Sequence, residues 1–367
     1  MNIKASFNKA SVRRWWLGAT VMAALTGLSS CSIMTEDYDN CPWELYVNFK
    51  YDYNIDRADM FRDHVGGVTL YVFDDAGKLV ERREVTNAGD GGVLKDYNYK
   101  MQFTDLPAGK YTLYAMAMQK GYDEAIGTRG AKYRRTEPLP GETADKLLVR
   151  LDRADNADAD GFHAVENEGM PMDTLWMSLG AVDVTVEAKE KYSPVYATIP
   201  LIRDTKRLTL TLRQIDKPTE IGTDDFDIYI TDANGLVHHD NTIEDDGKLK
   251  YTPYAEWQTE EDINATDKRN VVHAELNFNR LIDHNDADKD ARLVVVNKKT
   301  GKKVADINLP AFLAQGRDAF SYYNYTPQEY LDRQHAYYLD LFLNGGEWIY
   351  MDLKVLSWSV RIQNTDL

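Results

Sequence analysis

Cysteine is scarce in this sequence: Cys31 and Cys41 are the only two among 367 residues. A framework of disulfide bonds therefore cannot hold the fold together, and a hydrophobic core has to do so. The sequence also lacks common catalytic motifs, since it contains no G-x-S-x-G, no H-E-x-x-H, no glycine-rich phosphate loop and no C-x-x-C pair. We therefore expect neither an enzyme nor a cofactor site.

Positive charge is also in short supply. The chain has 43 basic and 59 acidic residues, and the first 30 residues hold four of the basic ones and no acid. A chain that starts at residue 31 therefore has 39 basic and 59 acidic side chains, a net charge of −20. That much negative charge repels nucleic acid and anionic lipid head groups. We expect no nucleic-acid partner and no membrane attachment through a basic patch.

A long apolar run is missing as well. The uncharged apolar stretch at 15–28 has 14 residues, whereas a helix needs about 20 to cross a bilayer. The stretch follows a basic segment and precedes small residues, which is the layout of a signal peptide, so residues 1–30 are expected to be removed. Arg13-Arg14 is compatible with twin-arginine export, although such a pair is more often only the positive charge of a signal peptide.

The end of this signal peptide predicts a lipid anchor. Leu28-Ser29-Ser30-Cys31 resembles a bacterial lipobox, in which the cysteine thiol is acylated with diacylglycerol and becomes the first residue after cleavage. Each buried methylene contributes about 0.8 kcal/mol, and two or more acyl chains give stable attachment. Cys31 is therefore the predicted lipidation site. The alternative is ordinary cleavage nearby and a disulfide between Cys31 and Cys41.

A short acidic tether is expected at 31–42, behind the lipidated cysteine. It carries Glu36, Asp37 and Asp39 and has no strand pattern. An acidic stretch at this place resembles the surface-export signal of Bacteroidota lipoproteins, which would place the protein on the outside of the cell. A solvated linker on the periplasmic side is the alternative.

From residue 43 onward the pattern is that of an all-β protein. Short alternating apolar segments are separated by turn residues, as in the strand at 68–73, the turn at 74–77 and the strand at 79–85. Alternation fades between 151 and 169, where acidic and small residues accumulate. We place a domain boundary there, with one β-sandwich at 43–160 and a second at 161–367.

The second domain is predicted to open with strands at 175–186 and 196–202 and to contain one helix. Thr326-Pro327-Gln328-Glu329 has the residues of a capping box with proline at the first helical position. Apolar and aromatic residues then recur at helical spacing, so we expect the helix to run from Thr326 to about Leu343, before Gly345-Gly346.

Metal sites are not expected, although two acidic stretches invite the question. Asn156-x-Asp158-x-Asp160-Gly161 matches the first half of a calcium-binding EF-hand loop, but Asn167 stands where a bidentate glutamate is needed. Asp286-x-Asp288-x-Asp290 lacks even the glycine. His238 and His239 are neighbours that would point to opposite faces of a strand. We expect all of these residues to lie in solvated surface loops.

Several segments in order resemble the FimB/Mfa-type family of fimbrial anchor lipoproteins of Bacteroidales. Besides the lipobox and the acidic tether, they are Asp39-Asn40-Cys41-Pro42, Phe49-Lys50-Tyr51-Asp52-Tyr53-Asn54, Val68-Thr69-Leu70-Tyr71-Val72-Phe73-Asp74, Leu106-Pro107-Ala108-Gly109-Lys110-Tyr111 and Trp358-Ser359-Val360-Arg361-Ile362-Gln363-Asn364. The resemblance implies two tandem transthyretin-like (Greek-key) β-sandwich domains. It also implies an outer-membrane lipid anchor at the base of a fimbria, where the protein limits fibre length and binds fimbrial subunits.

The resemblance leaves open how a subunit docks. Only five residues follow Ile362, too few for a donor strand, so we expect this chain to accept a strand or dock a subunit, and removal of residues 363–367 to leave anchoring intact. The alternative is a fimbrial tip protein or a glycan-binding adhesive surface lipoprotein. A cluster of exposed aromatic rings around Trp257, which lies in a polar stretch, would favour sugar binding.

Overall fold

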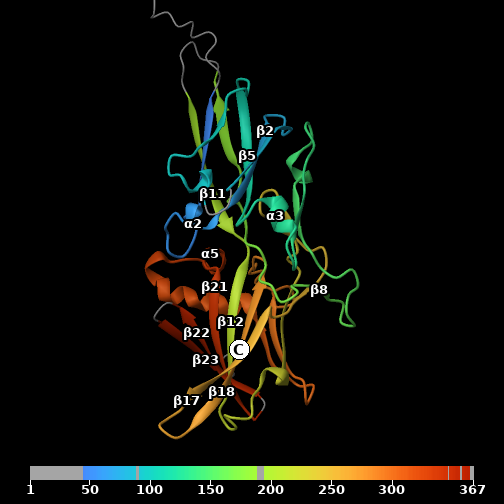
Figure 1. Cartoon of the computed structure of the whole chain (residues 1–367), viewed down its shortest axis with the longest axis vertical. Helices are drawn as coiled ribbons and strands as arrows, with labels where there is room; N and C mark the ends of the chain where they lie inside the picture. The colour runs from blue at the N-terminus through green and yellow to red at the C-terminus, as the bar shows by residue number, and fades with distance from the viewer. Residues whose placement is uncertain (1–43, 88–90, 188–193, 346, 356–357, 364–367) are drawn as a thin grey trace, which may run out of the picture.

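The computed structural model describes residues 44–87, 91–187, 194–345, 347–355 and 358–363. The predicted signal peptide, Cys31, Cys41 and the acidic tether lie outside these residues. The described chain is predominantly β, and it forms an elongated molecule with one half above the other in Figure 1. The predicted all-β fold is confirmed.

The upper half is built on an eight-stranded sheet. Along the sheet the order is β3 (Leu79–Thr86), β2 (Gly67–Asp74), β5 (Gly109–Met118), β9 (Leu175–Ser178), β11 (Val195–Arg203), β1 (Leu45–Lys50) and β4 (Met101–Phe103), with β10 (Val182–Val186) pairing with β5. The apolar run of β2 is buried on both faces, as expected for a central strand covered from two sides. Val68, Leu70 and Val72 enter one core, and Tyr71 and Phe73 enter another.

A four-stranded sheet covers the second of these faces. Its order is β15 (Ile243–Glu244), β14 (Leu236–His238), β7 (Leu148–Leu151) and β6 (Tyr133–Thr136). Tyr133 and Val149 of this sheet share a core with Tyr71 and Phe73. The upper half is therefore a sandwich of two sheets whose inner faces meet.

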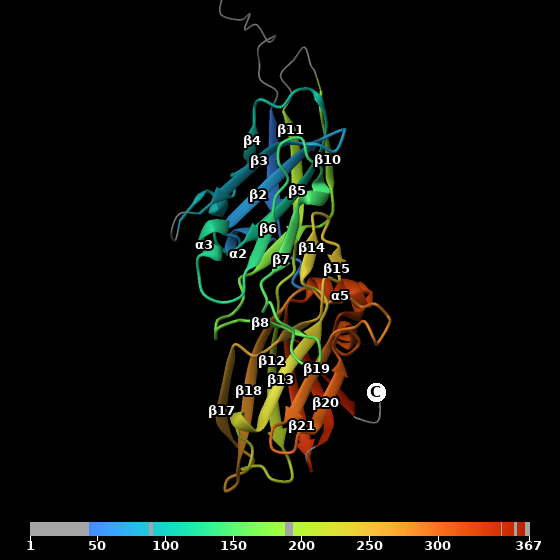
Figure 2. The ribbon, with the colours of Figure 1, turned by 90° about the vertical axis from the view of Figure 1, so that its right-hand side faces the viewer.

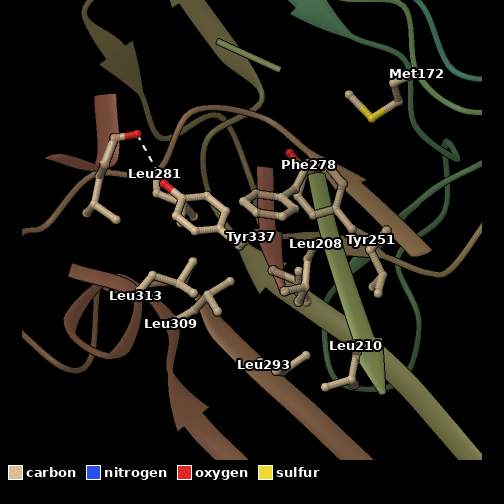
Figure 3. Packing of buried hydrophobic residues seen from close by; sticks show 14 of the residues in the cluster. Met172, Leu208, Leu210, Tyr251, Phe278, Leu281, Leu293, Leu309, Leu313 and Tyr337 are labelled. Atoms are coloured by element: carbon tan, nitrogen blue, oxygen red, sulfur yellow. Dashed lines mark hydrogen bonds between the residues drawn. The ribbon is translucent and has the colours of Figure 1, made fainter. Parts of the chain in front are cut away.

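The lower half is a second sandwich. A six-stranded sheet has the order β17 (Ala255–Asp262), β18 (Lys268–Phe278), β12 (Lys206–Gln214), β21 (Ala336–Asn344), β22 (Glu347–Val355) and β23 (Trp358–Gln363). It packs against a five-stranded sheet with the order β20 (Lys303–Asn308), β19 (Arg292–Asn297), β13 (Phe226–Asp232), β16 (Leu249–Tyr251) and β8 (His163–Val165). Figure 3 shows Leu208 and Leu210 of β12 in this core with Leu293 of β19.

The two halves exchange strands, which the sequence did not predict. The hairpin β14–β15 lies in the lower half's portion of the sequence, yet β14 pairs with β7 of the upper half. Conversely, β8 precedes the upper strands β9 to β11 in the chain but pairs with β16 below. The strands at 175–178, 182–186 and 195–203, which we expected to open the second domain, instead hydrogen bond within the eight-stranded sheet. Strand pairing therefore changes over near residue 204 rather than at residue 160.

The predicted helix from Thr326 to about Leu343 is wrong in its second half. Helix α5 spans Pro327–Arg333 with Thr326 as its N-cap, and strand β21 begins at Ala336. Leu339, Leu341 and Leu343 face the core at every second position, and β21 is hydrogen bonded to β12 on one side and β22 on the other. The segment has apolar residues at both spacings, and the ladders on both sides decide in favour of the strand.

The remaining helical segments are short. They are α2 (Phe61–His64), α3 (Tyr122–Ile126), α4 (Leu309–Leu313) and the 3₁₀ segments η2 (Val93–Lys95), η3 (Ala144–Lys146), η4 (Thr223–Asp225) and η5 (Ala314–Tyr323). Within the described ranges, no helix has the length and apolar character needed to cross a membrane.

The direction of the strands relates the start of the described chain to the long axis. Strand β11 runs down the upper half, and after Asp204 and Thr205 the chain continues as β12 down the lower half (Figures 1 and 2). Strand β1 is parallel to β11, so Leu45 lies at the upper end and Lys50 nearer the lower half. We call the upper end the Glu44 pole. The opposite end, with the β17–β18 turn at residues 263–267, is the far pole.

Candidate functional sites

The predicted lipidation site, Cys31, lies outside the described residues, but the point from which its tether leaves is well defined. The Glu44 backbone oxygen accepts a hydrogen bond from the Val195 N–H at 2.8 Å. Next to it the Tyr46 and Tyr196 rings stack with 5.3 Å between their centroids. The sequence puts 12 residues between Cys31 and Glu44. A lipid on Cys31 would therefore attach the molecule by its Glu44 pole.

The sheet edges of the lower half are the places where another chain could add a strand. The six-stranded sheet ends in β17 on one side and in β23 on the other. Strand β17 carries Glu256, Glu260, Glu261 and Asp262 and is largely exposed. Charged edges of this kind discourage strand addition. Strand β23 pairs with β22, and in the described part of the chain its other edge has no neighbouring strand.

The outer face of the six-stranded sheet is crossed by ion pairs. Arg213 binds Glu261 of β17 at 2.7 Å and Asp340 of β21 at 2.8 Å. The Arg213 side chain, which donates hydrogen bonds to Glu261, holds the pKa of that carboxyl down at about 2. These pairs connect β12 to the neighbouring β21 and to β17 two strands away, so the charge around Arg213 is largely matched within the sheet.

Trp257 is 39 % exposed on this outer face, as its polar surroundings in the sequence suggested. Its ring stacks on His273 of the adjacent strand, with centroids 5.0 Å apart and planes 14° apart. Tyr338, another exposed ring on this face, lies on β21, three strands away in the sheet. Among the side chains that the structure describes, no cluster of exposed aromatic rings surrounds Trp257.

A pocket of about 270 Å³ lies where the two halves meet, beside the end of β13. Phe162, Ile243 and Ile282 form an apolar wall, and Lys248, His284 and Asp288 are among its polar lining residues. Its volume is close to the lower end of the roughly 300–1,000 Å³ common for small-molecule sites. The lining residues come from four separate segments of the sequence, so no local sequence motif could predict the pocket.

Asp232, at the end of β13, is the unusual group in this pocket. Its Oδ1 accepts a hydrogen bond from the Ala233 N–H at 2.8 Å, whereas its Oδ2 is buried and has no hydrogen-bond partner among the described residues. Burial raises the pKa of the Asp232 carboxyl to about 7. A carboxyl with an unmet acceptor favours a donor group, such as a ligand hydroxyl or its own proton.

A second set of charges is buried at the junction of the halves. This junction cluster consists of Asp204, Lys206, Arg280 and Asp332. Asp204 and Lys206 are both 0 % exposed. The Lys206 ammonium donates to the backbone oxygens of Asp332 at 2.8 Å and Gln334 at 3.1 Å, and burial lowers its pKa. The charged residues shortly after the strand predicted at 196–202 were a signal from which the sequence could have indicated this cluster.

In both acidic stretches, carboxylates accept hydrogen bonds from nearby backbone and side-chain groups. Asp158 Oδ1 accepts the N–H groups of Asp160 and Phe162 at 3.0 and 2.9 Å, so it is used in shaping its own loop. Asp290 accepts from the His284 N–H at 2.9 Å and from the Asn308 amide at 2.9 Å. The described residues contain no group of three or more His, Cys, Asp or Glu placed to hold a metal ion.

The two adjacent histidines have different surroundings. His238 Nε2 lies 2.8 Å from the Glu244 carboxylate on the neighbouring strand β15. The His239 ring packs edge-on against Tyr114 of the upper half, with centroids 4.8 Å apart, and burial lowers its pKa. His238 lies on β14 and not in the solvated surface loop that we expected, and His239 is half-buried in the turn that follows.

Comparison with known proteins points to fimbriae. A profile of the family described as fimbrillin-A associated anchor proteins Mfa1 and Mfa2 matches residues 38–364. A curated relative, the minor fimbrium anchoring subunit Mfa2 of Porphyromonas gingivalis, is 24 % identical over 226 residues, which is 61 % of this chain and 61 % of the relative. The match thus spans about three fifths of the relative's length.

Solved structures share the fold. A candidate polysaccharide-binding protein of Bacteroides thetaiotaomicron is 31 % identical with a TM-score of 0.67, and the match covers 88 % of this chain and 99 % of that one. A candidate adhesin of the same species is 26 % identical with a TM-score of 0.69 at the same coverage. The fimbrial anchor protein Mfa2 of P. gingivalis has a TM-score of 0.59 at 17 % identity, covering 87 % and 99 %, and shows the fold alone.

Proposed function

The chain belongs to the family of fimbrillin-A associated anchor proteins Mfa1 and Mfa2, and from this membership we propose that it anchors the base of a fimbria to the outer membrane. The family supports a structural, non-enzymatic role at a fimbrium on the cell surface. The finer proposal is that acyl chains on Cys31 hold the Glu44 pole at the membrane and that a fimbrial subunit docks on the lower half. The net charge of −20 for the chain from residue 31 speaks against nucleic acid as a partner.

One observation carries this proposal: the described chain begins at one end of the long axis, and the lower sandwich lies at the other (Figure 1). A lipid that is separated from Glu44 by 12 residues would keep the upper half near the bilayer. The lower half, with its open sheet edge at β23, would then point away from the cell. A cap at the fibre base is also the position from which a protein could limit fibre length.

Two cysteine variants test the lipid. We expect Cys31→Ala to release the protein and its fimbriae into the medium, while Cys41→Ala leaves both on the cell. Mass spectrometry of the mature amino terminus should find acyl chains on Cys31. If instead the two cysteines form a disulfide, the two variants would behave alike and Cys31 would be unmodified, and the proposal would fail.

Docking is tested with photo-crosslinking residues placed at single positions. A probe at Arg361 on β23 should capture a fimbrial subunit, whereas probes at Thr259 on β17 and at Gln102 near the Glu44 pole should not. Removal of residues 363–367 should leave anchoring intact, because β23 would accept a strand rather than donate one. Loss of anchoring on truncation, or capture only at Gln102, would count against this docking edge. A strain without the protein should shed longer fimbriae.

The second candidate function is adhesion through glycan binding, and the pocket at Asp232 favours it. The relative that is 31 % identical is named as a candidate polysaccharide-binding protein. In this chain, Phe162 offers an aromatic wall and Asp232 an acceptor for sugar hydroxyls. On a glycan array, Asp232→Asn and Phe162→Ala should each weaken binding roughly tenfold, the effect of about 1.4 kcal/mol. Trp257→Ala, outside the pocket, should not. If all three variants bound glycan as well as the unmodified protein does, the pocket would be excluded as the binding site.

A further inference from the structure

Strand β1 is placed to carry tension. It pairs with β11 in parallel over six residue pairs, from Leu45↔Val195 to Lys50↔Pro200, and with β4 over three. Its amino-terminal end lies at the Glu44 pole, and the strand runs from there toward the lower half. A pull on the preceding chain, directed away from the molecule, therefore acts along the axis of β1. It does not act across the hydrogen bonds that hold the strand.

The partner of β1 is connected covalently to the lower half. Strand β11 ends at Arg203 and β12 begins at Lys206, so these two strands form one nearly continuous rod along the molecule (Figure 1). In the lower half, β12 pairs with β21 in parallel and with β18 in antiparallel orientation, over eight residue pairs each. Tension that reaches β11 thus passes through peptide bonds into the centre of the lower sheet.

We propose that β1 is a shear clamp, through which pulling force on the membrane tether is transmitted to the β11–β12 rod. This inference rests on the proposed function, in which the tether is fixed at Cys31 and the fibre pulls on the lower half. Under shear, the ladder hydrogen bonds on both sides of β1 share the load and have to break together, whereas peeling would break them one at a time. The buried side chains of Leu45, Val47 and Phe49 have to leave the core in the same step.

The geometry also identifies the element that yields first. The clamp comprises six pairs on one side and three on the other, fewer than the eight on each side of β12. If the buried segment that follows β1 leaves the core with it, the chain is freed as far as the start of β2 at Gly67. Those 23 residues extend to about 80 Å at about 3.5 Å per residue. Because the folded segment already spans part of that length, the first event under load should be a step of at most about this size, with the rest of the molecule still folded.

Single-molecule force spectroscopy on the full chain tests the clamp without lipid or fibre. Handles are attached at Cys31 and at Ala265→Cys in the far-pole turn, with Cys41→Ser. A disulfide between Val47→Cys and Ala197→Cys, which are register partners on β1 and β11, should abolish the first step. The matched control is a disulfide between Asp227→Cys and Val296→Cys, partners on β13 and β19, which should leave the step unchanged.

A weakened clamp gives the second readout. At constant force, Val47→Ala should shorten the dwell before the first step roughly tenfold. Leu293→Ala, an equally buried truncation in the lower half, should leave that dwell unchanged. An initial step much longer than 80 Å, or a step that persists in the Val47–Ala197 disulfide form, would overturn the clamp. The same results would leave lipidation at Cys31 and docking at β23 untouched, because those are read out by the cysteine variants and by crosslinking.

Discussion

The Arg280 guanidinium donates two hydrogen bonds to the Asp332 carboxylate, from Nε at 2.7 Å and from Nη2 at 2.8 Å. Arg280 follows β18, and Asp332 lies in α5, so the pair fixes the helix against the top of the lower sandwich. The same Asp332 accepts the Lys206 ammonium through its backbone oxygen, next to the β11–β12 connection. Two parallel charged hydrogen bonds fix orientation as well as distance. The junction between the halves is therefore organised by this pair.

Removing one partner of this pair should be costly. Asp332→Ala leaves the Arg280 charge buried without its carboxylate, which typically lowers the free energy of unfolding by about 3–5 kcal/mol. Urea denaturation measures the loss. Asp152→Ala serves as control, since the exposed pair Arg134–Asp152 should contribute less than about 1 kcal/mol. Similar losses in the two variants would show that the junction pair is no more than a surface ion pair.

The exchanged hairpin should stabilise the half that receives it. Val237 of β14 is 0 % exposed and packs in the core shared by the upper sandwich. Val237→Ala should cost roughly 1–3 kcal/mol. Hydrogen exchange should then accelerate in β6 and β7, although these strands lie some 90–100 residues earlier in the chain. Val80→Ala, at an exposed position of β3, should change stability by less than about 0.5 kcal/mol. Faster exchange confined to the lower half would contradict the pairing.

Asp232 predicts a pH dependence of stability. Its pKa is about 7 in the folded protein, above the value of 3.8 for the unfolded chain, because burial disfavours the charged form. Between these values the folded state binds more protons than the unfolded state, so this group's contribution is fully present below pH 3.8 and is lost as the pH rises through 7. Asp232→Asn should make the decline in stability between pH 4 and 7 shallower. Parallel pH profiles for the two proteins, from thermal unfolding, would contradict this assignment.

Removing the N-cap of α5 should have a smaller effect on the free energy of unfolding, and a conservative substitution at the same residue serves as the control. The Thr326 hydroxyl accepts the Glu329 N–H at 3.1 Å. Thr326→Ala removes that acceptor and should lower the free energy of unfolding by about 1 kcal/mol. Thr326→Ser keeps the hydroxyl and should retain most of the stability. Equal loss in both variants would point to the missing methyl group rather than to the cap.

Local patterns identified several strands correctly. The run at 68–73 and the turn at 74–77 correspond to β2 and the connection to β3, and the strand predicted at 196–202 corresponds to β11. These predictions hold because burial on one or both faces of a strand leaves a direct trace in the spacing of apolar residues. The N-cap of α5 was also correct, since capping depends on only a few neighbouring residues.

The errors share one cause, which is pairing between distant segments. The spacing of apolar residues around Leu339, Leu341 and Leu343 fits a strand as well as a helix. Only the hydrogen bonds to β12 on one side and β22 on the other select the strand. The fading alternation near residue 160 reflects loops around β8, and the strands that follow return to the upper sheet. The pocket at Asp232 was not predicted for the same reason, because its lining residues come from separate segments of the sequence.

The sequence by itself determined the β class, the acidic character, the absence of a disulfide framework and the predicted lipid site, because each depends on composition or on neighbouring residues. Tertiary structure alone decided which strands pair, that β14–β15 and β8 are exchanged between the halves, and that β1 lies parallel to β11 with its first residue at one end of the long axis. Hydrogen bonding between strands depends on the position of the partner in space, and one strand's pattern does not specify its partner.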